Sequence, residues 1–332
     1  MNKQILLKSR PIGKPVADNF EIVAFPAELA KDGELLVKAK YVSVDPYMRG
    51  RMSDAKSYVP PFEVGKAIEG SVIAEVIESH HPNFKVGDAV LASLKWQELQ
   101  TVPAVNVTKL AKNVAPLSYY LGVLGMPGLA AYLGLLDIGK PETGETVVIS
   151  GAAGAVGMVV GQIARIKGCK VVGIAGTDEK TEFLVDKLRF DEAINYRTTK
   201  NMNEAIATAC TKGVDIYFDN VGGEISDAVI ANINKGARII VCGQISLYNN
   251  TEIPTGPRPQ AMILKKRALM QGFIVSDYVS RFPEGIKRLT QWLGEGKLSY
   301  QETIIKGFEK LPEAFTGLFE GKNTGKMLVE IE

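Results

Sequence analysis

Residues 147–157 read Val-Val-Ile-Ser-Gly-Ala-Ala-Gly-Ala-Val-Gly, a short apolar run followed by small residues. The apolar run is typical of a buried strand, and the small residues leave room for a tight turn and the start of a helix. Gly154 and Gly157 stand at the second and third glycine positions of a dinucleotide-binding fingerprint, with Ala152 at the first. There the backbone approaches a pyrophosphate, which the free N–H groups at the helix start bind. The stretch therefore predicts a dinucleotide site, and a ligand-free contact between helix and strand is the alternative.

The residues that follow repeat this alternation of strand and helix. Further buried strands are expected at 170–175, 192–196, 214–219, 237–242 and 268–275, and helices at 155–167, 177–188 and 281–294. Such an alternation is typical of a parallel sheet with helices on both faces. Before residue 103, short runs rich in Val and Ile, at 34–39, 70–77 and 88–93, are separated by Pro, Gly, Asp and Asn. This pattern predicts a partly open β-barrel, and the tail from residue 297 returns to it.

The composition is that of a globular protein with about two domains. Of the 332 residues, 46% are hydrophobic and 23% are charged, which excludes global disorder. The net charge of +2 gives no electrostatic support for a nucleic-acid or membrane partner. The uncharged stretches 113–136 and 146–164 approach the length of a membrane span. Both are interrupted by glycines, and we interpret them as buried core.

Few side chains are available to bind a metal ion. The two histidines are adjacent, as His80-His81, in what reads as an exposed turn, and the three cysteines are far apart in the sequence. No three ligands have the spacing of a zinc site, so any hydride chemistry here is expected to proceed without zinc. With unpaired thiols and no apolar export signal at the N-terminus, the protein is expected in the cytoplasm.

The end of the strand 170–175 bears on which nicotinamide dinucleotide would bind. NAD enzymes place an acidic residue at this strand end to hold the ribose 2′-hydroxyl, and the strand here ends without one. Asp178 and Glu179 come later, in the expected first turn of a helix, where acidic side chains interact favourably with the helix dipole. Lys180, and further on Arg197, are instead placed to face a 2′-phosphate. We therefore expect NADP(H) rather than NAD(H).

Two other strand ends carry polar groups that suit chemistry beside a nicotinamide ring. Asn220 directly follows one strand and precedes Gly222 and Gly223, which leave room for a flat ring. Tyr248 lies a few residues beyond the strand 237–242. Ligands of open parallel sheets bind beyond the carboxyl ends of the strands. A tyrosine hydroxyl there is a candidate hydrogen-bond donor or general acid toward a carbonyl oxygen, and simple packing in a loop is the alternative.

Several motifs together resemble a known family. They are the segments 44–49, 125–129, 151–157, 218–223, 242–249 and 321–326, which are spread over nearly the whole chain. With them the chain resembles the zinc-independent medium-chain dehydrogenases/reductases. Among these it is most similar to the leukotriene B4 dehydrogenase, prostaglandin reductase and curcumin reductase group of NADPH-dependent alkenal/one double-bond reductases. Zinc-bearing relatives have a Gly-His-Glu segment, and the corresponding stretch here, 65–70, contains no histidine.

The resemblance implies a fold and a reaction. The fold is α/β: a Rossmann doubly wound parallel sheet, residues 123–297, is inserted in a GroES-like, partly open β-barrel domain of residues 1–122 and 298–332. The reaction is NADPH-dependent reduction of the C=C bond of an α,β-unsaturated ketone or aldehyde, with hydride going to the β-carbon. The enolate oxygen would be held by Tyr248, by a cofactor ribose hydroxyl, or by both. Relatives are often homodimers.

The resemblance also implies roles for individual residues. Tyr47 and Tyr248 would flank the substrate. The residues that would contact the pyrophosphate are Gly154, Ala155, Val156 and Gly157, and those at the 2′-phosphate end are Lys180 and Tyr196. The nicotinamide half would be lined by Asn220, Cys242, Gly243, Gln244, Ile245, Ser246, Tyr248, Phe273, Ile274, Val275 and Asn323. A quinone reductase of the same superfamily, and a dinucleotide-binding sensor without turnover, remain alternatives.

Overall fold

The computed structural model describes residues 2–111 and 114–331, and the chain divides into two compact units. The barrel unit comprises Met1–Leu121, Thr303–Asn323 and Met327–Glu332, and the α/β unit comprises Gly122–Glu302 and Thr324–Lys326. The domain limits expected from the sequence, at 122/123 and 297/298, stay predictions. Positions 1, 112, 113 and 332, which fall in the expected barrel domain, lie outside the described residues, as does the first residue of the uncharged stretch 113–136.

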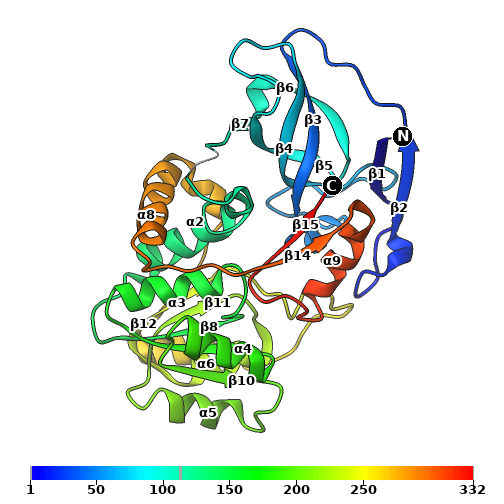
Figure 1. Cartoon of the computed structure of the whole chain (residues 1–332). Helices are drawn as coiled ribbons and strands as arrows, with labels where there is room; N and C mark the ends of the chain where they lie inside the picture. Colours follow the sequence, from blue (N-terminus) through cyan, green and yellow to red (C-terminus); the bar gives the residue numbers. More distant parts are fainter. Residues whose placement is uncertain (1, 112–113, 332) are drawn as a thin grey trace. The chain divides into compact units, whose positions relative to one another are not determined.

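The barrel unit is built mainly from antiparallel strands (Figure 1). Its largest sheet has the order β14-β15-β3-β4-β5-β7, β6 also pairs with β3, and β1 and β2 form a separate pair. The strands are β1 (Asn2–Leu7), β2 (Phe20–Phe25), β3 (Glu34–Ser43), β4 (Glu69–Ser79), β5 (Ala89–Lys95), β6 (Leu99–Pro103), β7 (Thr108–Lys109), β14 (Glu302–Lys306) and β15 (Lys326–Glu330). The helices of this unit are α1 (Met48–Arg51) and α9 (Leu311–Leu318), apart from short 3-10 turns.

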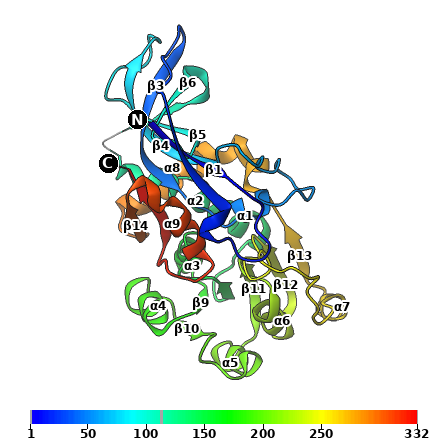
Figure 2. The same ribbon diagram turned by 90° about the vertical axis from the view of Figure 1, so that its right-hand side faces the viewer.

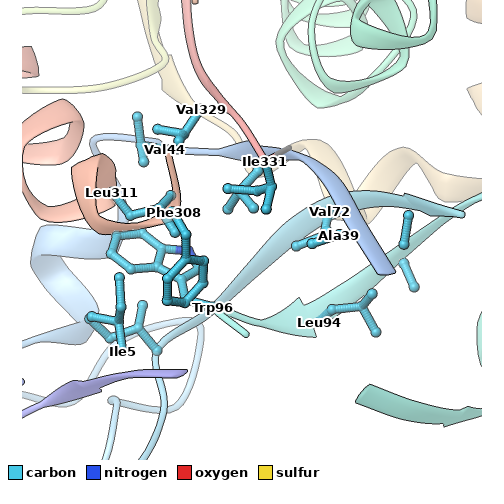
Figure 3. Packing of buried hydrophobic residues seen from close by; sticks show 14 of the residues in the cluster. Ile5, Ala39, Val44, Val72, Leu94, Trp96, Phe308, Leu311, Val329 and Ile331 are labelled. Carbon is cyan, nitrogen blue, oxygen red and sulfur yellow. The ribbon is translucent and has the colours of Figure 1, made fainter. Parts of the chain in front are cut away.

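Alternation of side chains along the strands forms the barrel core. In β3, Leu35, Val37 and Ala39 are buried while the residues between them are partly exposed. Trp96 lies at the centre of the core, with its ring centroid 6.5 Å from that of Phe20. Figure 3 shows Trp96 close to Phe308 and the neighbouring aliphatic side chains. Burial of this aromatic and aliphatic surface stabilises the unit.

The α/β unit contains one parallel sheet in the order β10-β9-β8-β11-β12-β13. Its strands are β8 (Thr146–Ser150), β9 (Lys170–Ala175), β10 (Glu192–Asn195), β11 (Val214–Asp219), β12 (Ile233–Val241) and β13 (Leu269–Gly272). Its helices are α2 (Met126–Leu133), α3 (Gly157–Ile166), α4 (Asp178–Glu182), α5 (Met202–Ala209), α6 (Gly223–Ala231), α7 (Gln260–Lys266) and α8 (Phe282–Gly294). α3 and α4 lie on one face of the sheet and α6 on the other (Figure 2). The expected α/β fold is confirmed.

The strand order reverses direction between β8 and β11. From β8 the chain proceeds to β9 and β10 on one side, then crosses back to β11, β12 and β13 on the other. The turns that follow β8 and β11 therefore leave in opposite directions at the carboxyl ends of the strands, which is where ligands of doubly wound sheets bind. In the register of this pair, Phe218 lies opposite Ile149, so Ser150 and Asp219 come at neighbouring strand ends.

The last strand of this sheet is shorter than the sequence indicates. We expected a strand at 268–275, whereas β13 ends at Gly272. β13 pairs only with β12, and its last residue lies opposite Val241, where β12 itself ends. Because no partner extends further, Phe273 and Ile274 leave the ladder and lead into a 3-10 segment, Val275–Arg281. Among the residues that the structure describes, no helix combines the length and apolar character needed to cross a membrane.

Candidate active site

The glycine loop after β8 has the close backbone contacts that its sequence requires. The chain turns at Gly151, which has a positive φ of 60°. A Cβ at Gly157, the first residue of α3, would lie 2.4 Å from the Gly151 carbonyl oxygen. Only glycine fits this approach of helix to strand. Ala155 and Val156 are partly exposed beside the helix start, where main-chain N–H groups are available to an anion.

A short piece of the C-terminal chain supports this loop. The Gly325 N–H donates to the Ala153 carbonyl at 2.8 Å, and Gly325 forms an isolated parallel bridge with Gly154. On its other side Gly325 lies so close to Gln301 that a Cβ would come within 1.9 Å of the Gln301 carbonyl oxygen. Thr324–Lys326 thus lies between the glycine loop and Gln301 like an additional strand of the α/β unit.

The ends of β9 and β10 form a cationic niche. Thr177 caps α4 by accepting from the Lys180 N–H at 3.3 Å, which places the Lys180 side chain at the helix start. Burial, and then the nearby Arg197 guanidinium, lower the pKa of Lys180. Tyr196 covers the turn between them, because a Cβ at Gly176 would lie 3.0 Å from its ring. Two cations and an aromatic ring at this place suit a phosphate on a ribose.

The acidic residue at this strand end is turned toward another partner. The Asn195 side-chain amide donates to Asp178 Oδ1 at 2.7 Å. The Asp178 carboxylate is thus engaged by β10 rather than placed alone beside the cations. The sequence expectation of a 2′-phosphate site rests on Lys180 and Tyr196, and the structure brings these two residues and Arg197 together.

At the carboxyl ends of β11 and β12 a network of hydrogen bonds holds two successive turns. The Asn220 side-chain amide donates to the Ser150 carbonyl at 2.8 Å. The Ser246 hydroxyl donates to the Val221 carbonyl at 2.6 Å, and the Gly243 N–H donates to the Asp219 carbonyl at 3.1 Å. The segment 242–248 therefore rests on the turn after β11, beyond the strand ends.

Tyr248 points back over its own turn. Its hydroxyl oxygen accepts a hydrogen bond from the Gln244 N–H at 3.2 Å, and it would lie 3.4 Å from a Cβ at Gly243. Burial raises the pKa of Tyr248, with smaller contributions from Cys242 and Asp219, while the bond from Gln244 lowers it. The phenol is therefore protonated at neutral pH. Since its oxygen is the acceptor in the bond to Gln244, its own proton can be donated to a ligand.

Five of the expected nicotinamide residues present backbone or apolar groups rather than polar side chains. The ring of the partly buried Phe273 packs edge-on against the buried Phe218, with the centroids 6.5 Å apart. Ile274 and Val275 are partly exposed. Burial, and then the charge of Asp219, raise the pKa of the Cys242 thiol to about 12, which makes it a poor nucleophile. Ile245 donates its N–H to the Asn220 carbonyl at 3.3 Å.

Tyr47 and Asn323 belong to the barrel unit. Tyr47 precedes α1, and 37% of its surface is exposed. Burial of its hydroxyl, and then the neighbouring Asp45 carboxylate, raise the pKa of Tyr47 to about 12, against a smaller effect of Arg51. Tyr47 is thus also a protonated donor. Asn323 is partly exposed near the end of the same unit's chain segment.

Sequence reasoning missed two buried polar residues of this region, Ser150 and Asp219. Both are the last residue of a mainly apolar strand, and both are at most 1% exposed. The signal was present in the sequence, because a buried polar residue requires hydrogen-bond partners. Within the described ranges no group of three or more His, Cys, Asp and Glu residues is arranged to hold a metal ion. His80 instead pairs with Glu78, with Nε2 2.6 Å from Oε1.

Comparison with known families identifies both parts of the chain. Residues 3–110 match a model of the N-terminal domain of oxidoreductases, and residues 155–291 match a model described as zinc-binding dehydrogenase. The chain therefore belongs to the medium-chain dehydrogenases/reductases. Despite the second description, the described residues include no zinc-ligand cluster.

Individual relatives narrow this assignment. The chain is 56% identical to the putative NADP-dependent oxidoreductase YfmJ of Bacillus subtilis and 44% identical to the NADPH-dependent curcumin reductase of Escherichia coli. It is 41% identical to the NADP-dependent 2-alkenal reductase of Nicotiana tabacum. Each alignment covers 99% of this chain and 97% of the relative.

A solved structure, CurA from Vibrio vulnificus in complex with NADPH, is 47% identical and superposes with a TM-score of 0.94 over 99% of each chain. The chain accordingly belongs to the zinc-independent, NADP-dependent group of double-bond reductases within the family.

Proposed function

We propose that the protein reduces the C=C bond of α,β-unsaturated ketones and aldehydes at the expense of NADPH. The observation that carries the proposal is Tyr248, a partly buried, protonated phenol beyond the end of β12, whose hydroxyl oxygen is held by the Gln244 N–H. Relatives that align over nearly the whole chain are named for curcumin and 2-alkenal reduction. A fixed donor of this kind suits an oxygen that gains negative charge during the reaction.

The residues of the α/β unit fit NADP(H) in three places. The glycine loop offers backbone N–H groups at the start of α3, where a Cβ at Gly157 would close the approach. Lys180 and Arg197 supply positive charge at the end of β9 and β10. Asn220 and the segment 242–248 lie together beyond the ends of β11 and β12, where ligands of doubly wound sheets bind. When bound, the reduced cofactor supplies the hydride.

The mechanism assigns the remaining tasks to the chain's own residues. Tyr248 donates a hydrogen bond to the substrate carbonyl, which lowers the barrier as negative charge moves onto that oxygen. We propose Tyr47 as a second donor that flanks the substrate, and Asn323 as a contact of the nicotinamide half. The bound cofactor would offer a ribose hydroxyl as a further possible donor to this oxygen. The α-carbon then takes a proton from the solvent, which completes the saturated ketone or aldehyde.

An NADPH-oxidation assay tests the proposal. Alkenals, simple enones and nitroalkenes are compared with a benzoquinone, and the products are identified by mass spectrometry. We expect the saturated ketone from an enone, with its carbonyl intact. Faster turnover of benzoquinone than of any enone would favour a quinone reductase. Tight NADPH binding without consumption by any electrophile would favour a sensor.

We also propose that the protein acts in the cytoplasm as a homodimer. Its cysteines Cys169, Cys210 and Cys242 are free. β13 is the last strand in the order of its sheet, and it carries the exposed apolar residue Leu269; Leu264, in the preceding helix α7, is also exposed. An unpaired edge with apolar side chains suits pairing with a second copy. Light scattering on the wild type and on Leu269→Lys tests this, and a monomeric wild type would contradict it.

A further inference from the structure

The ends of the two central strands meet at a single buried carboxylate. Ser150 ends β8 and Asp219 ends β11, and the Ser150 hydroxyl donates to Asp219 Oδ1 at 2.9 Å. Their strands are the pair between which the order of the sheet reverses. This is the place at which ligands of doubly wound sheets enter.

Asp219 Oδ1 is the common acceptor of four donors. Besides the Ser150 hydroxyl, the Tyr217 hydroxyl donates to it at 2.8 Å. The main-chain N–H groups of Val221 and Gly222 donate to it at 3.0 and 2.9 Å. These two N–H groups belong to the turn that follows β11, so the carboxylate fixes the turn itself and not only the strand end.

The same cluster fixes the next turn along the sheet. The Asp219 main-chain carbonyl accepts from the N–H groups of Cys242 and Gly243 at 2.9 and 3.1 Å. Ser150 adds a second connection, because its hydroxyl oxygen accepts from the Asn220 N–H at 2.9 Å while its carbonyl accepts from the Asn220 side chain. The turns after β11 and β12, which carry Asn220 and Tyr248, are therefore tied to the end of β8 through one centre.

Burial of this polar cluster costs desolvation free energy, which suggests that the cluster does more than pack the strands together. Tyr217 and Ser150 are 0% exposed and Asp219 is 1% exposed, and all three lie among apolar strands. Burial of a carboxylate costs desolvation free energy, and at Asp219 the four hydrogen bonds offset that cost. The charge of Asp219 also contributes to the raised pKa of Cys242 and of Tyr248, so its influence reaches the segment 242–248.

We propose that Asp219, together with Ser150, is a positioning residue for the nicotinamide half of the cofactor: it holds the turns that carry Asn220 and Tyr248 in the geometry that receives the ring. The inference rests on the proposed function, because it presupposes NADP(H). The inference assigns Asp219 to the nicotinamide half of the cofactor site and not to the 2′-phosphate niche. The 2′-phosphate niche is built at the ends of β9 and β10, whereas the hydrogen bonds to the Asp219 side chain come from Ser150, from Tyr217 and from the turn after β11.

Two ligands separate the halves of the site. Adenosine 2′,5′-bisphosphate carries the adenine, the 2′-phosphate and one 5′-phosphate but no nicotinamide, and NADPH carries all of them. Binding of each is measured by calorimetry to wild type, Asp219→Asn, Ser150→Ala and Tyr217→Phe. We expect Asp219→Asn to weaken NADPH about tenfold, the equivalent of one charge-assisted hydrogen bond, while the bisphosphate binds as in wild type.

Ser150→Ala, which loses the bonds to Asp219 and Asn220, is expected to weaken NADPH about threefold to tenfold in the same selective way. Tyr132→Phe serves as a matched control for Tyr217→Phe. It removes a tyrosine–carboxylate bond of equal length, to Glu284 at 2.8 Å, within the same unit. The ratio of the two dissociation constants should be unchanged in Tyr132→Phe.

The outcomes are distinct. Equal weakening of both ligands by Asp219→Asn and Ser150→Ala, or a lower Tm with an unchanged ratio, would mean a structural role only and overturn the inference. If Asp219→Asn does not fold, as judged by circular dichroism, the ratio in Ser150→Ala and Tyr217→Phe decides. A wild type that binds neither ligand would instead overturn the proposed function, and the inference with it.

Discussion

The two units handle their buried polar groups differently. In the barrel unit, some of these groups connect separate pieces of backbone: Asn2 donates to the Leu99 carbonyl at 2.6 Å, and Arg49 donates to the Gly13 carbonyl at 2.8 Å. In the α/β unit, Ser150 and Tyr217 both donate to Asp219 at the strand ends. These contacts of Asn2 and Arg49 share no residue, whereas the turns that carry Asn220 and Tyr248 are both tied to Asp219.

This difference indicates how far the effect of a substitution should extend in each unit. Loss of one scattered contact affects one loop, and the aromatic core around Trp96 remains (Figure 3). Changes at the strand ends of the α/β unit instead reach the proposed cofactor site directly. Four substitutions sharpen or contradict this contrast.

The largest effect is expected from Gly157→Ala. The added Cβ would meet the Gly151 carbonyl oxygen at 2.4 Å and Ala152 Cα at 2.7 Å, both backbone atoms that cannot rotate away. We expect NADPH binding to weaken by about a hundredfold or more, since the helix start and the glycine loop must separate. Calorimetry measures this. Gly294→Ala, where a Cβ meets nothing within 4 Å, is the control, and equal behaviour of the two variants would contradict the prediction.

Tyr248→Phe is expected to lower kcat by about ten- to a hundredfold and to leave the dissociation constant of NADPH nearly unchanged. The change removes the proton donor but keeps the ring over Gly243. Stopped-flow kinetics with a simple enone separates the two quantities. Tyr47→Phe, in the barrel unit, is the comparison. Wild-type kcat in Tyr248→Phe would refute the role assigned to this residue.

Lys180→Met is expected to weaken NADPH by about tenfold and NADH very little, because one ion pair with the 2′-phosphate is lost. Burial lowers the pKa of Lys180, so the folded state disfavours its charge at neutral pH. Removal of the charge should therefore raise the Tm of the ligand-free protein slightly rather than lower it. A lower Tm with unchanged NADPH affinity would contradict both statements.

The lowered pKa of Lys180 also predicts a pH dependence. As the pH rises toward the usual lysine value of 10.5, Lys180 loses its proton earlier than an exposed lysine does. The affinity for NADPH, but not for NADH, should then decline in the alkaline range. Titration of both ligands against wild type and Lys180→Met measures this difference, and parallel profiles would count against the niche.

The smallest effect is expected in the barrel. At Gly70 the added Cβ of an alanine would meet the end of the Met48 side chain at 2.7 Å, and this flexible atom can move. Gly70→Ala should cost about 1 to 2 kcal/mol of stability and leave the affinity for NADPH unchanged. Chemical denaturation and calorimetry give the two values. A loss of NADPH affinity would show that the units are not independent in this respect.

Much of the α/β unit could be predicted because its strands are continuous apolar runs. β9 was expected at 170–175 and is found there, and β11 likewise at 214–219. The glycine loop was recognised because its small residues are adjacent in sequence. The bond between Ser150 and Asp219 could not be predicted, because it depends on β8 pairing with β11, 69 residues away. Strand order is a property of the whole sheet and is not encoded at either end.

The position of Thr324–Lys326 has a practical consequence for the division of this protein into parts. The three residues belong to the α/β unit, while Asn323 and Met327 on either side belong to the barrel unit. An excised fragment of residues 122–302 would therefore lack the peptide that the Ala153 carbonyl binds through Gly325. In a chimera that takes its cofactor-binding segment from a relative, this peptide comes from the same relative only if the junction lies beyond residue 326. A chimera joined at residue 302 combines a glycine loop and a supporting peptide from different parents.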